Sequence, residues 1–288
     1  MSAALENPDI IAQIFGPAQG LDVSQQSEED IILSFQESLD LDRAITQRPG
    51  NTFSYTEKMS MLRSFEELNA RKNYEGHLRY FQPDGPSGYK EYPKHIEFLN
   101  LGADHRERMF MAGNRVGKSI TGGYEMACHA TGIYPEWWAG KRFNHPVDCW
   151  GAGDTSQTTR DIVQLTLLGP PGDWGTGLIP KACIPEGGMR MRPGVPEALD
   201  NIKVLHASGG ISKIGFKSYD QKRRAFQGTS KHVIWLDEEP PMDVYGECLV
   251  RTMTTKGVVY VTFTPLMGIT PFVQEFLDAA RLGGQLPY

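Results

Sequence analysis

The 288 residues are enough for one large domain, or for one domain and an appendage, and 40% hydrophobic residues can form a sizeable core. A net charge of −6 argues against a wholly basic nucleic-acid-binding protein. The four cysteines lack metal-ligand spacing and indicate buried thiols in a reducing compartment, and neither a signal peptide nor an apolar run of membrane-span length is recognisable.

The amino-terminal region is acidic and is predicted to be mostly helical. Residues 1–50 carry nine acids against two arginines, a net charge of −7, whereas the rest of the chain sums to +1. Apolar residues at helical spacing predict helices within 28–46 and 55–82. The proline- and glycine-rich stretch Gln82–Gly88 is the best linker candidate. We therefore expect a small helical appendage over residues 1–82 and the main domain over 83–288.

A short segment with an aromatic and a polar ring follows the linker. Tyr92 offers a flat aromatic surface, and His95 offers a hydrogen-bonding ring three residues later. Together they are candidates to hold an adenine ring.

The stretch 108–119 carries the strongest functional signal of the chain. The apolar run Met109–Ala112 predicts a buried strand, and Ile120–Thr131 predicts a helix. A strand, a glycine-bearing loop and a helix in this order build a phosphate cradle from backbone N–H groups and the positive helix end. In such a loop Lys118 reaches the β- and γ-phosphates and Ser119 holds Mg²⁺. The predicted phosphate-contacting residues are Ala112, Gly113, Asn114, Arg115, Val116, Gly117, Lys118 and Ser119.

This loop is an imperfect match to the common pattern. Ala112 stands where the pattern has its first glycine, and Gly113 is next. The alternative interpretation is an ordinary strand-to-helix turn with a solvated lysine.

The middle of the chain predicts further sheet elements. Residues 146–151 predict a second core strand, and Asp154 is the expected cap of the helix that follows it. The glycine- and proline-rich stretch 168–200 is expected to be a long surface excursion. Asn201–His206 and Ile211–Ser218 predict a hairpin. Six basic residues against one acid within 213–231 form a patch compatible with DNA contact, or simply a solvated hairpin.

An acidic strand end supplies the second half of a nucleotide site. The apolar run Val233–Leu236 predicts a strand that ends in three consecutive acids. Asp237 is suited to hold Mg²⁺, Glu238 to polarise the attacking water, and Glu239 to a structural or solvated role. The alternative is an acidic loop after a core strand.

A third strand end completes the set of candidates. Gly257–Phe263 predicts another buried strand, and Thr262 and Thr264 at its tip are candidates to sense the γ-phosphate. A threonine before a proline at a strand end is equally compatible with a plain turn.

These ordered segments resemble one family over about residues 85–275. Glu107–Ser119 resembles the phosphate loop of tailed-phage large terminase subunits, which often carry an internal arginine and tolerate a non-glycine first position. Tyr92–Phe98 is similar to the adenine-side motif of that family, which usually has glutamine where His95 stands. Further similar segments are Arg224–Thr229 and Val233–Pro240, which lead into the acidic strand, and Thr262–Pro265, which resembles the coupling motif.

The resemblance implies an ATP-driven motor that pumps double-stranded viral DNA into an empty procapsid, with ATP and Mg²⁺ as cofactors. By position, Lys118 and Ser119 bind phosphate and Mg²⁺, Asp237 coordinates the metal, Glu238 activates water, and Thr264 lies in the coupling motif.

The resemblance also implies a role for arginines. Arg115 is expected to contact the γ-phosphate in cis, and an arginine of a neighbouring subunit is expected to complete the site. Arg224 is the first candidate for that arginine and Arg160 the second, with a salt bridge or a surface role as the alternative for each.

The implied partners are double-stranded viral DNA, the portal protein, the small terminase subunit and further copies of the chain in a ring, expected to be a pentamer. No membrane partner is expected. The implied location is the cytoplasm of the infected bacterium, with transient residence on the procapsid and not in the mature virion. Family members carry a carboxy-terminal nuclease domain, but only 51 residues follow Asp237. Nuclease activity is therefore not expected from this chain.

The predicted fold is an α/β P-loop NTPase of the ASCE/RecA-like class. A mostly parallel, twisted sheet is expected from strands near 109–112, 147–151, 233–237 and 258–263, with helices on both faces and the helical appendage before it.

Three functional alternatives remain beside the packaging motor. An ATP-dependent helicase or translocase of another P-loop class shares the loop and the acids, although a two-lobed helicase needs a second lobe. A GTP-binding switch needs an Asn-Lys-x-Asp motif that the chain lacks. A scaffold with an inactive nucleotide site is the third, against which the intact Lys118, Asp237 and Glu238 argue.

Overall fold

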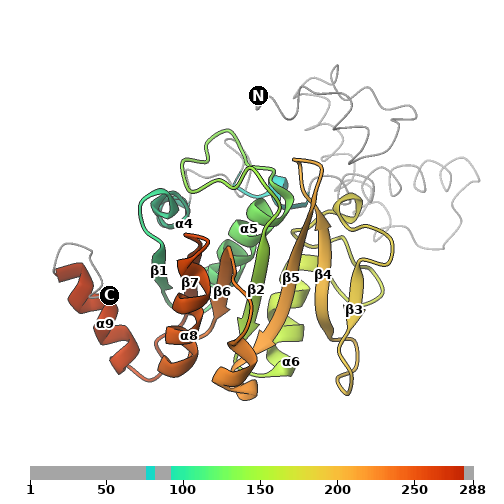
Figure 1. Cartoon of the computed structure of the whole chain (residues 1–288). Coiled ribbons are helices and arrows are strands. Elements are labelled where there is room, and N and C mark those ends of the chain that lie inside the picture. The colour runs from blue at the N-terminus through green and yellow to red at the C-terminus, as the bar shows by residue number, and fades with distance from the viewer. Residues whose placement is uncertain (1–75, 82–91, 282–288) are drawn as a thin grey trace, which may run out of the picture.

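The computed structural model describes residues 76–81 and 92–281, and these form a seven-stranded sheet between two layers of helices (Figure 1). The expected amino-terminal helices up to residue 75 and the expected linker lie outside the described residues, and the boundary near residue 82 stays a prediction. The strands are β1 (Glu107–Met111), β2 (Asp148–Gly153), β3 (Met189–Met191), β4 (Leu199–Leu205), β5 (Ile211–Ser218), β6 (Val233–Asp237) and β7 (Val258–Phe263).

The strand order is β1-β7-β6-β2-β5-β4-β3. The first five strands in this order are parallel to one another, while β4 and β3 continue the sheet in antiparallel fashion. The mostly parallel sheet and the hairpin of β4 and β5 are thus confirmed. β7 lies between the strand before the phosphate loop, β1, and the strand that ends in acids, β6. Such an inserted strand is the arrangement of the expected ASCE class of P-loop NTPases.

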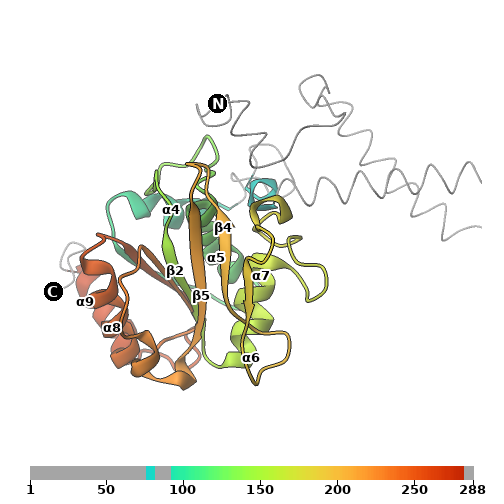
Figure 2. The ribbon, with the colours of Figure 1, turned by 45° about the vertical axis from the view of Figure 1, so that its right-hand side comes forward.

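Helices cover both faces of the parallel part of the sheet (Figure 2). One face of the sheet packs on α5, and the other face packs on α8 and α9. The contact of α9 is made through Phe272 and Val273, which belong to the second hydrophobic cluster. The helices are α4 (Pro93–Asn100), α5 (Lys118–Thr131), α6 (Ser156–Thr158), α7 (Leu165–Leu168), α8 (Met242–Met253) and α9 (Pro271–Arg281), and a π-helical turn, Thr159–Gln164, joins α6 to α7. None of the helices in the described ranges is long and apolar enough to cross a membrane.

The helix after β2 begins differently from the sequence-based expectation. Thr155, not Asp154, is the cap residue: its side chain accepts a hydrogen bond from the Thr158 backbone N–H, and the Thr158 hydroxyl accepts one from the Thr155 N–H. This reciprocal pair satisfies two donors at the start of the helix, which a single aspartate one residue earlier does not do.

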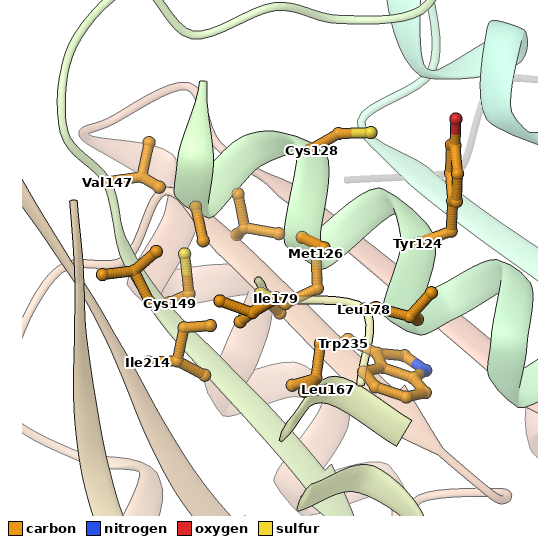
Figure 3. Close-up of a cluster of buried hydrophobic side chains, with 14 of the residues drawn as sticks. Tyr124, Met126, Cys128, Val147, Cys149, Leu167, Leu178, Ile179, Ile214 and Trp235 are labelled. Atoms are coloured by element: carbon orange, nitrogen blue, oxygen red, sulfur yellow. The ribbon is translucent and has the colours of Figure 1, made fainter. Parts of the chain in front are cut away.

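The expected surface excursion over residues 168–200 is wrong in part. Leu178, Ile179 and Cys183 are fully buried, and Leu178 and Ile179 lie in the core between α5 and the sheet (Figure 3). The backbone N–H groups of Leu178 and Ile179 donate to the carbonyls of Thr166 and Leu167, which fixes the segment along α7 and turns its apolar side chains inward. The many glycines and prolines around Leu178 and Ile179 favoured the prediction of a surface loop.

The helix after the phosphate loop lies very close to the sheet. A Cβ placed on Gly122 of α5 would lie 2.4 Å from Nε1 of Trp235 on β6. Only glycine permits this approach, and it brings the start of α5 next to the end of β6. The carboxyl ends of β6 and β7 therefore lie beside the phosphate loop.

Candidate nucleotide-binding site

The phosphate loop connects β1 to α5 over residues 112–117. Gly117 has φ 86° and Arg115 has φ 61°, both in the left-handed region that glycine adopts without cost. The loop residues 113–116 are exposed, and α5 begins directly at Lys118. The first N–H groups of a helix have no partner within it, so this end of α5 offers donors and positive potential to an anion.

Lys118 lies across the loop. Its ammonium group donates to the carbonyl oxygen of Gly113 at 2.6 Å, and only 8% of the residue is exposed. A phosphate oxygen is charged and is therefore a stronger acceptor than this carbonyl. The lysine is thus held over the loop in a position from which it can exchange a neutral partner for an anionic one.

The acid at the end of β6 meets the serine at the start of α5. Asp237 is 2% exposed, and its Oδ1 accepts hydrogen bonds from the hydroxyls of Ser119 at 3.0 Å and Thr262 at 2.7 Å. Burial raises the pKa of Asp237 to about 6, and the Glu238 carboxylate acts in the same direction, while the two hydroxyls and the Lys118 charge oppose the rise. The carboxyl group is therefore ionised at neutral pH but is destabilised in that form, so a cation at this point is favoured.

The Ser119–Asp237 pair fits a magnesium ion. A hydroxyl and a carboxylate are hard oxygen ligands, and Mg²⁺ is commonly held by one or two protein groups with water and substrate phosphates completing its octahedron. Within the described ranges no group of three or more His, Cys, Asp or Glu side chains is arranged to hold a metal. An ion at Ser119 and Asp237 would thus share its ligands with the nucleotide rather than sit in a protein cage.

Glu238 is held in a strained backbone conformation. Its φ is 70°, its N–H donates to the Thr262 carbonyl at 2.9 Å, and its carbonyl accepts from the Tyr219 hydroxyl at 3.0 Å. The same hydroxyl lies 3.1 Å from the Asp237 carbonyl. A left-handed conformation in a non-glycine residue costs on the order of 1–3 kcal/mol and persists where neighbours impose it. The half-buried carboxylate makes no hydrogen bond to a described residue, which leaves it available for water.

The two threonine candidates differ in their partners. Thr262 receives a hydrogen bond from the Trp235 indole N–H at 2.7 Å and donates to Asp237, so its hydroxyl is fully engaged in holding the acid. Thr264 donates to the side-chain oxygen of Asn114 in the loop at 2.8 Å. Of the two, Thr264 is the one that links the end of β7 directly to the phosphate loop.

The adenine-side candidates lie under the same loop. His95 Nε2 is 2.7 Å from the Val116 carbonyl oxygen, so Nε2 is the donor of this hydrogen bond. Nδ1 is buried without a partner among the described residues. The Tyr92 ring packs edge-on against His95 with centroids 5.2 Å apart, and Tyr92 is 36% exposed. The His95 side chain thus binds the backbone of the loop, while the Tyr92 ring stays partly exposed.

In the described part of the chain, none of the three arginine candidates bonds to Asp237 or Glu238. Arg115 and Arg224 are exposed, and neither side chain has a hydrogen-bonding or ionic partner among the described residues. Arg160 is engaged by Asp161 at 2.7 Å and by the Pro196 carbonyl at 3.1 Å. This difference favours Arg224 over Arg160 as a group that is free to reach another subunit.

Sequence reasoning missed two residues that shape the site. Tyr219 fixes the backbone of both acids, and Trp235 orients the hydroxyl that holds Asp237. Trp235 stands two residues before Asp237, so strand alternation indicates that both side chains point to one face. Tyr219 carries no such local signal, because it reaches β6 from the end of a strand two places away in the sheet.

Comparisons with known proteins identify the family of the chain. The family model for the terminase large subunit, T4likevirus-type, N-terminal, matches residues 109–281. The large terminase subunit of Salmonella phage P22 is 39% identical over 248 residues, which cover 79% of the chain and 47% of the relative, so the chain spans about half the length of that protein. The large terminase of the thermophilic bacteriophage D6E, solved in complex with ADP, is 13% identical with a TM-score of 0.40 and covers 75% of the chain and 44% of the solved one. The match over 109–281 covers more than half of the chain and contains the phosphate loop and the acidic strand, and the chain therefore belongs to the terminase large subunit family.

Proposed function

We propose that this chain is the ATPase of a viral DNA-packaging motor, hydrolysing ATP to drive double-stranded DNA into a procapsid. The observation that carries the proposal is the meeting of Ser119 and Asp237 at 3.0 Å beside the loop that Lys118 spans. This hydrogen bond joins residues that are 118 positions apart in the chain, and it supports a single shared site for phosphate and metal. The helicase alternative has no such specific support, and the family membership argues against it.

Each residue has a defined task in the proposed reaction. The loop N–H groups and Lys118 bind the β- and γ-phosphates, and Ser119 and Asp237 hold Mg²⁺. Bound Mg²⁺ supplies positive charge to the phosphate oxygens. Glu238 orients a water molecule and accepts its proton as the water oxygen attacks the γ-phosphorus. The bond to the β-phosphate oxygen breaks, ADP leaves with the bonding electrons, and inorganic phosphate is the second product.

The arginines and Thr264 extend the proposal to coupling. Arg115 contacts the γ-phosphate from within the loop, and Arg224 approaches the site of a neighbouring subunit in the ring. Thr264, bonded to Asn114, transmits the state of the loop to the end of β7. The proposed setting is a homo-oligomeric ring, a pentamer, that works with the portal protein and the small terminase subunit on the procapsid in the host cytoplasm.

Two substitutions test the site. Lys118→Ala should abolish nucleotide binding in calorimetry, with the exposed Lys181→Ala as the matched control. Glu238→Gln should retain binding yet lower turnover by roughly 10²–10⁴-fold, because it removes the proton acceptor. The adjacent Glu239→Gln is its control, since Glu239 is engaged by the Thr270 hydroxyl. Micromolar ATP binding by the lysine variant, or normal hydrolysis by Glu238→Gln, would contradict these assignments.

The motor itself is tested by ATPase rates across protein concentration, with and without DNA and empty procapsid. Turnover should rise cooperatively as subunits assemble, and Arg224→Ala should lower the assembled rate by roughly 10³–10⁵-fold. A rate per subunit that is independent of concentration, DNA and procapsid would indicate a monomeric enzyme instead.

A further inference from the structure

Among the residues that the structure describes, no helix lies over one face of the sheet at its antiparallel end. In Figures 1 and 2, β3, β4 and β5 carry helices on the side of α5 and α7, while their other side faces outward. Exposure alternates accordingly along β5, where Ile211 and Lys213 are exposed and Ser212 and Ile214 are buried. β6 and β7, in contrast, are buried along their whole length. We call this outward side of β3, β4 and β5 the open sheet face.

Two lysines stand directly opposite each other on the open sheet face. Lys203 on β4 pairs in register with Lys213 on β5. The Lys203 N–H donates to the Gly188 carbonyl and the Lys213 N–H to the Val147 carbonyl, so neither points toward the other strand. They form a non-hydrogen-bonded pair, the kind in which the Cα atoms are closest, at about 4.5 Å. Like charges in such a pair are destabilising, so the fold tolerates a repulsion here.

Two further cations share this face. Arg190 on β3 pairs with Asn201, which lies two residues before Lys203 on the same side of β4. Lys217 follows Lys213 by four residues on β5, again on the same side. The exposed Arg190, Lys203 and Lys213 and the partly exposed Lys217 thus form a cationic surface on three adjacent strands.

Two acids, Asp148 and Asp200, lie near this surface. Asp148, in register with Lys213, is bonded at 2.7 Å to Lys231, a cation that is itself buried against Trp150. Burial lowers the pKa of Lys217, the Asp200 carboxylate opposes this change, and the charges of Arg192, Lys231 and Lys213 lower the pKa further. Asp200 thus offsets part of the positive charge around Lys217, and Asp148 is already bonded to Lys231.

We propose that the open sheet face binds the phosphate backbone of double-stranded DNA through Arg190, Lys203, Lys213 and Lys217. The inference rests on the proposed function, which brings duplex DNA to this chain. Four residues along a strand span about 13 Å and two strand spacings span about 10 Å, so the cations can meet several phosphates of one duplex. Lysines that contact phosphates give sequence-independent binding, which suits a protein that must move along any sequence.

The test is the salt dependence of DNA binding by the full chain. Binding of a fluorescent 30-base-pair duplex is measured without nucleotide, across a range of salt concentrations, for Lys203→Gln/Lys213→Gln. Loss of two phosphate contacts should reduce the slope of log K against log salt by about 2 and weaken binding at least about tenfold at 0.15 M salt, equally for different sequences. Lys94→Gln/Lys181→Gln, which removes two exposed lysines elsewhere, is the matched control and should change neither quantity.

Stability separates a binding role from a structural one. Neutralising the opposed lysines should leave the melting temperature unchanged or raise it, because a repulsion is removed. Lys213→Glu should raise it further by pairing with Lys203 and should weaken DNA binding more strongly. An unchanged slope and affinity in both variants would overturn the proposal. A lower melting temperature with unchanged affinity would also overturn it, and would indicate that the two lysines have a structural role.

The same variants distinguish this inference from the proposed function. The double glutamine variant should keep its basal, DNA-independent ATPase rate. If the unaltered chain hydrolyses ATP but its DNA affinity does not depend on these lysines, the open-face site is refuted and the ATPase proposal stands. Lysine-dependent DNA binding by a chain that never hydrolyses ATP supports the open-face site and refutes the ATPase proposal.

Discussion

Replacing Asp237 by asparagine should make the protein more stable above neutral pH while it removes the proposed metal ligand. The carboxyl group is 2% exposed, and burial raises its pKa from 3.8 to about 6. A difference of about two units between the unfolded and folded pKa corresponds to about 3 kcal/mol. At pH 8 the folded protein carries that cost, because it must keep a buried carboxylate ionised. Asparagine carries no charge, and its side-chain oxygen can still accept from Ser119 and Thr262.

The sign of the pH dependence follows from the raised pKa. Below about pH 4 the carboxyl group is protonated in both states, and its contribution to folding is fully present. Between about pH 4 and 6 the folded state holds the proton more tightly, so stability is lost as the pH rises through the folded pKa. With Asp237→Asn the free energy of unfolding should exceed that of the unaltered chain by about 3 kcal/mol at pH 8, and by about half as much at pH 5.

The assay is urea unfolding at pH 5 and pH 8 with EDTA present, so that no divalent ion binds the carboxylate. Asp104→Asn, an exposed aspartate, is the matched control and should differ from the unaltered chain by less than about 0.5 kcal/mol at both pH values. Adding Mg²⁺ and ADP at one hundred times the dissociation constant should then stabilise the unaltered chain by about 2.7 kcal/mol and the Asp237 variant much less. Equal stability of variant and unaltered chain at pH 8, or a difference that does not depend on pH, would refute the reasoning.

Two further predictions concern the packing around the phosphate loop. Gly122→Ala should lower the free energy of unfolding, measured in urea, by about 1–3 kcal/mol, because the new methyl group would lie 2.4 Å from Trp235 Nε1. This loss should exceed the gain from the higher helix propensity of alanine. Gly246→Ala in α8, where an added Cβ meets no atom within 4 Å, should instead stabilise by about 0.5–1 kcal/mol, and a loss there would show that the helix argument is wrong. Glu125→Gln should cost about 3–5 kcal/mol by leaving the buried Arg108 guanidinium uncompensated, and a double-mutant cycle with Arg108→Met should show strong coupling. Additive losses in that cycle would mean that the ion pair contributes nothing specific.

Local sequence determined the elements that carry the chemistry. The apolar runs before Lys118 and before Asp237 predicted strands, and the structure confirms both as β1 and β6 with shifts of at most two residues. The helix expected from Ile120 begins two residues earlier, at Lys118. Hydrophobic periodicity, glycine-bearing turns and strand-terminal acids act over a few residues, so a single sequence is enough to read them.

Tertiary structure alone decided how those elements meet. Three features arise from residues that are far apart in the chain. β7 lies between β1 and β6, burial raises the pKa of Asp237, and the Tyr219 hydroxyl donates to the backbone carbonyls of both acids. The opposition of Lys203 and Lys213 likewise follows from strand register, which the turn and the packed face select together. Chain order specifies which groups are available, but desolvation and neighbouring charges depend on three-dimensional packing, and these set how strongly each group binds a proton, a metal ion or a phosphate.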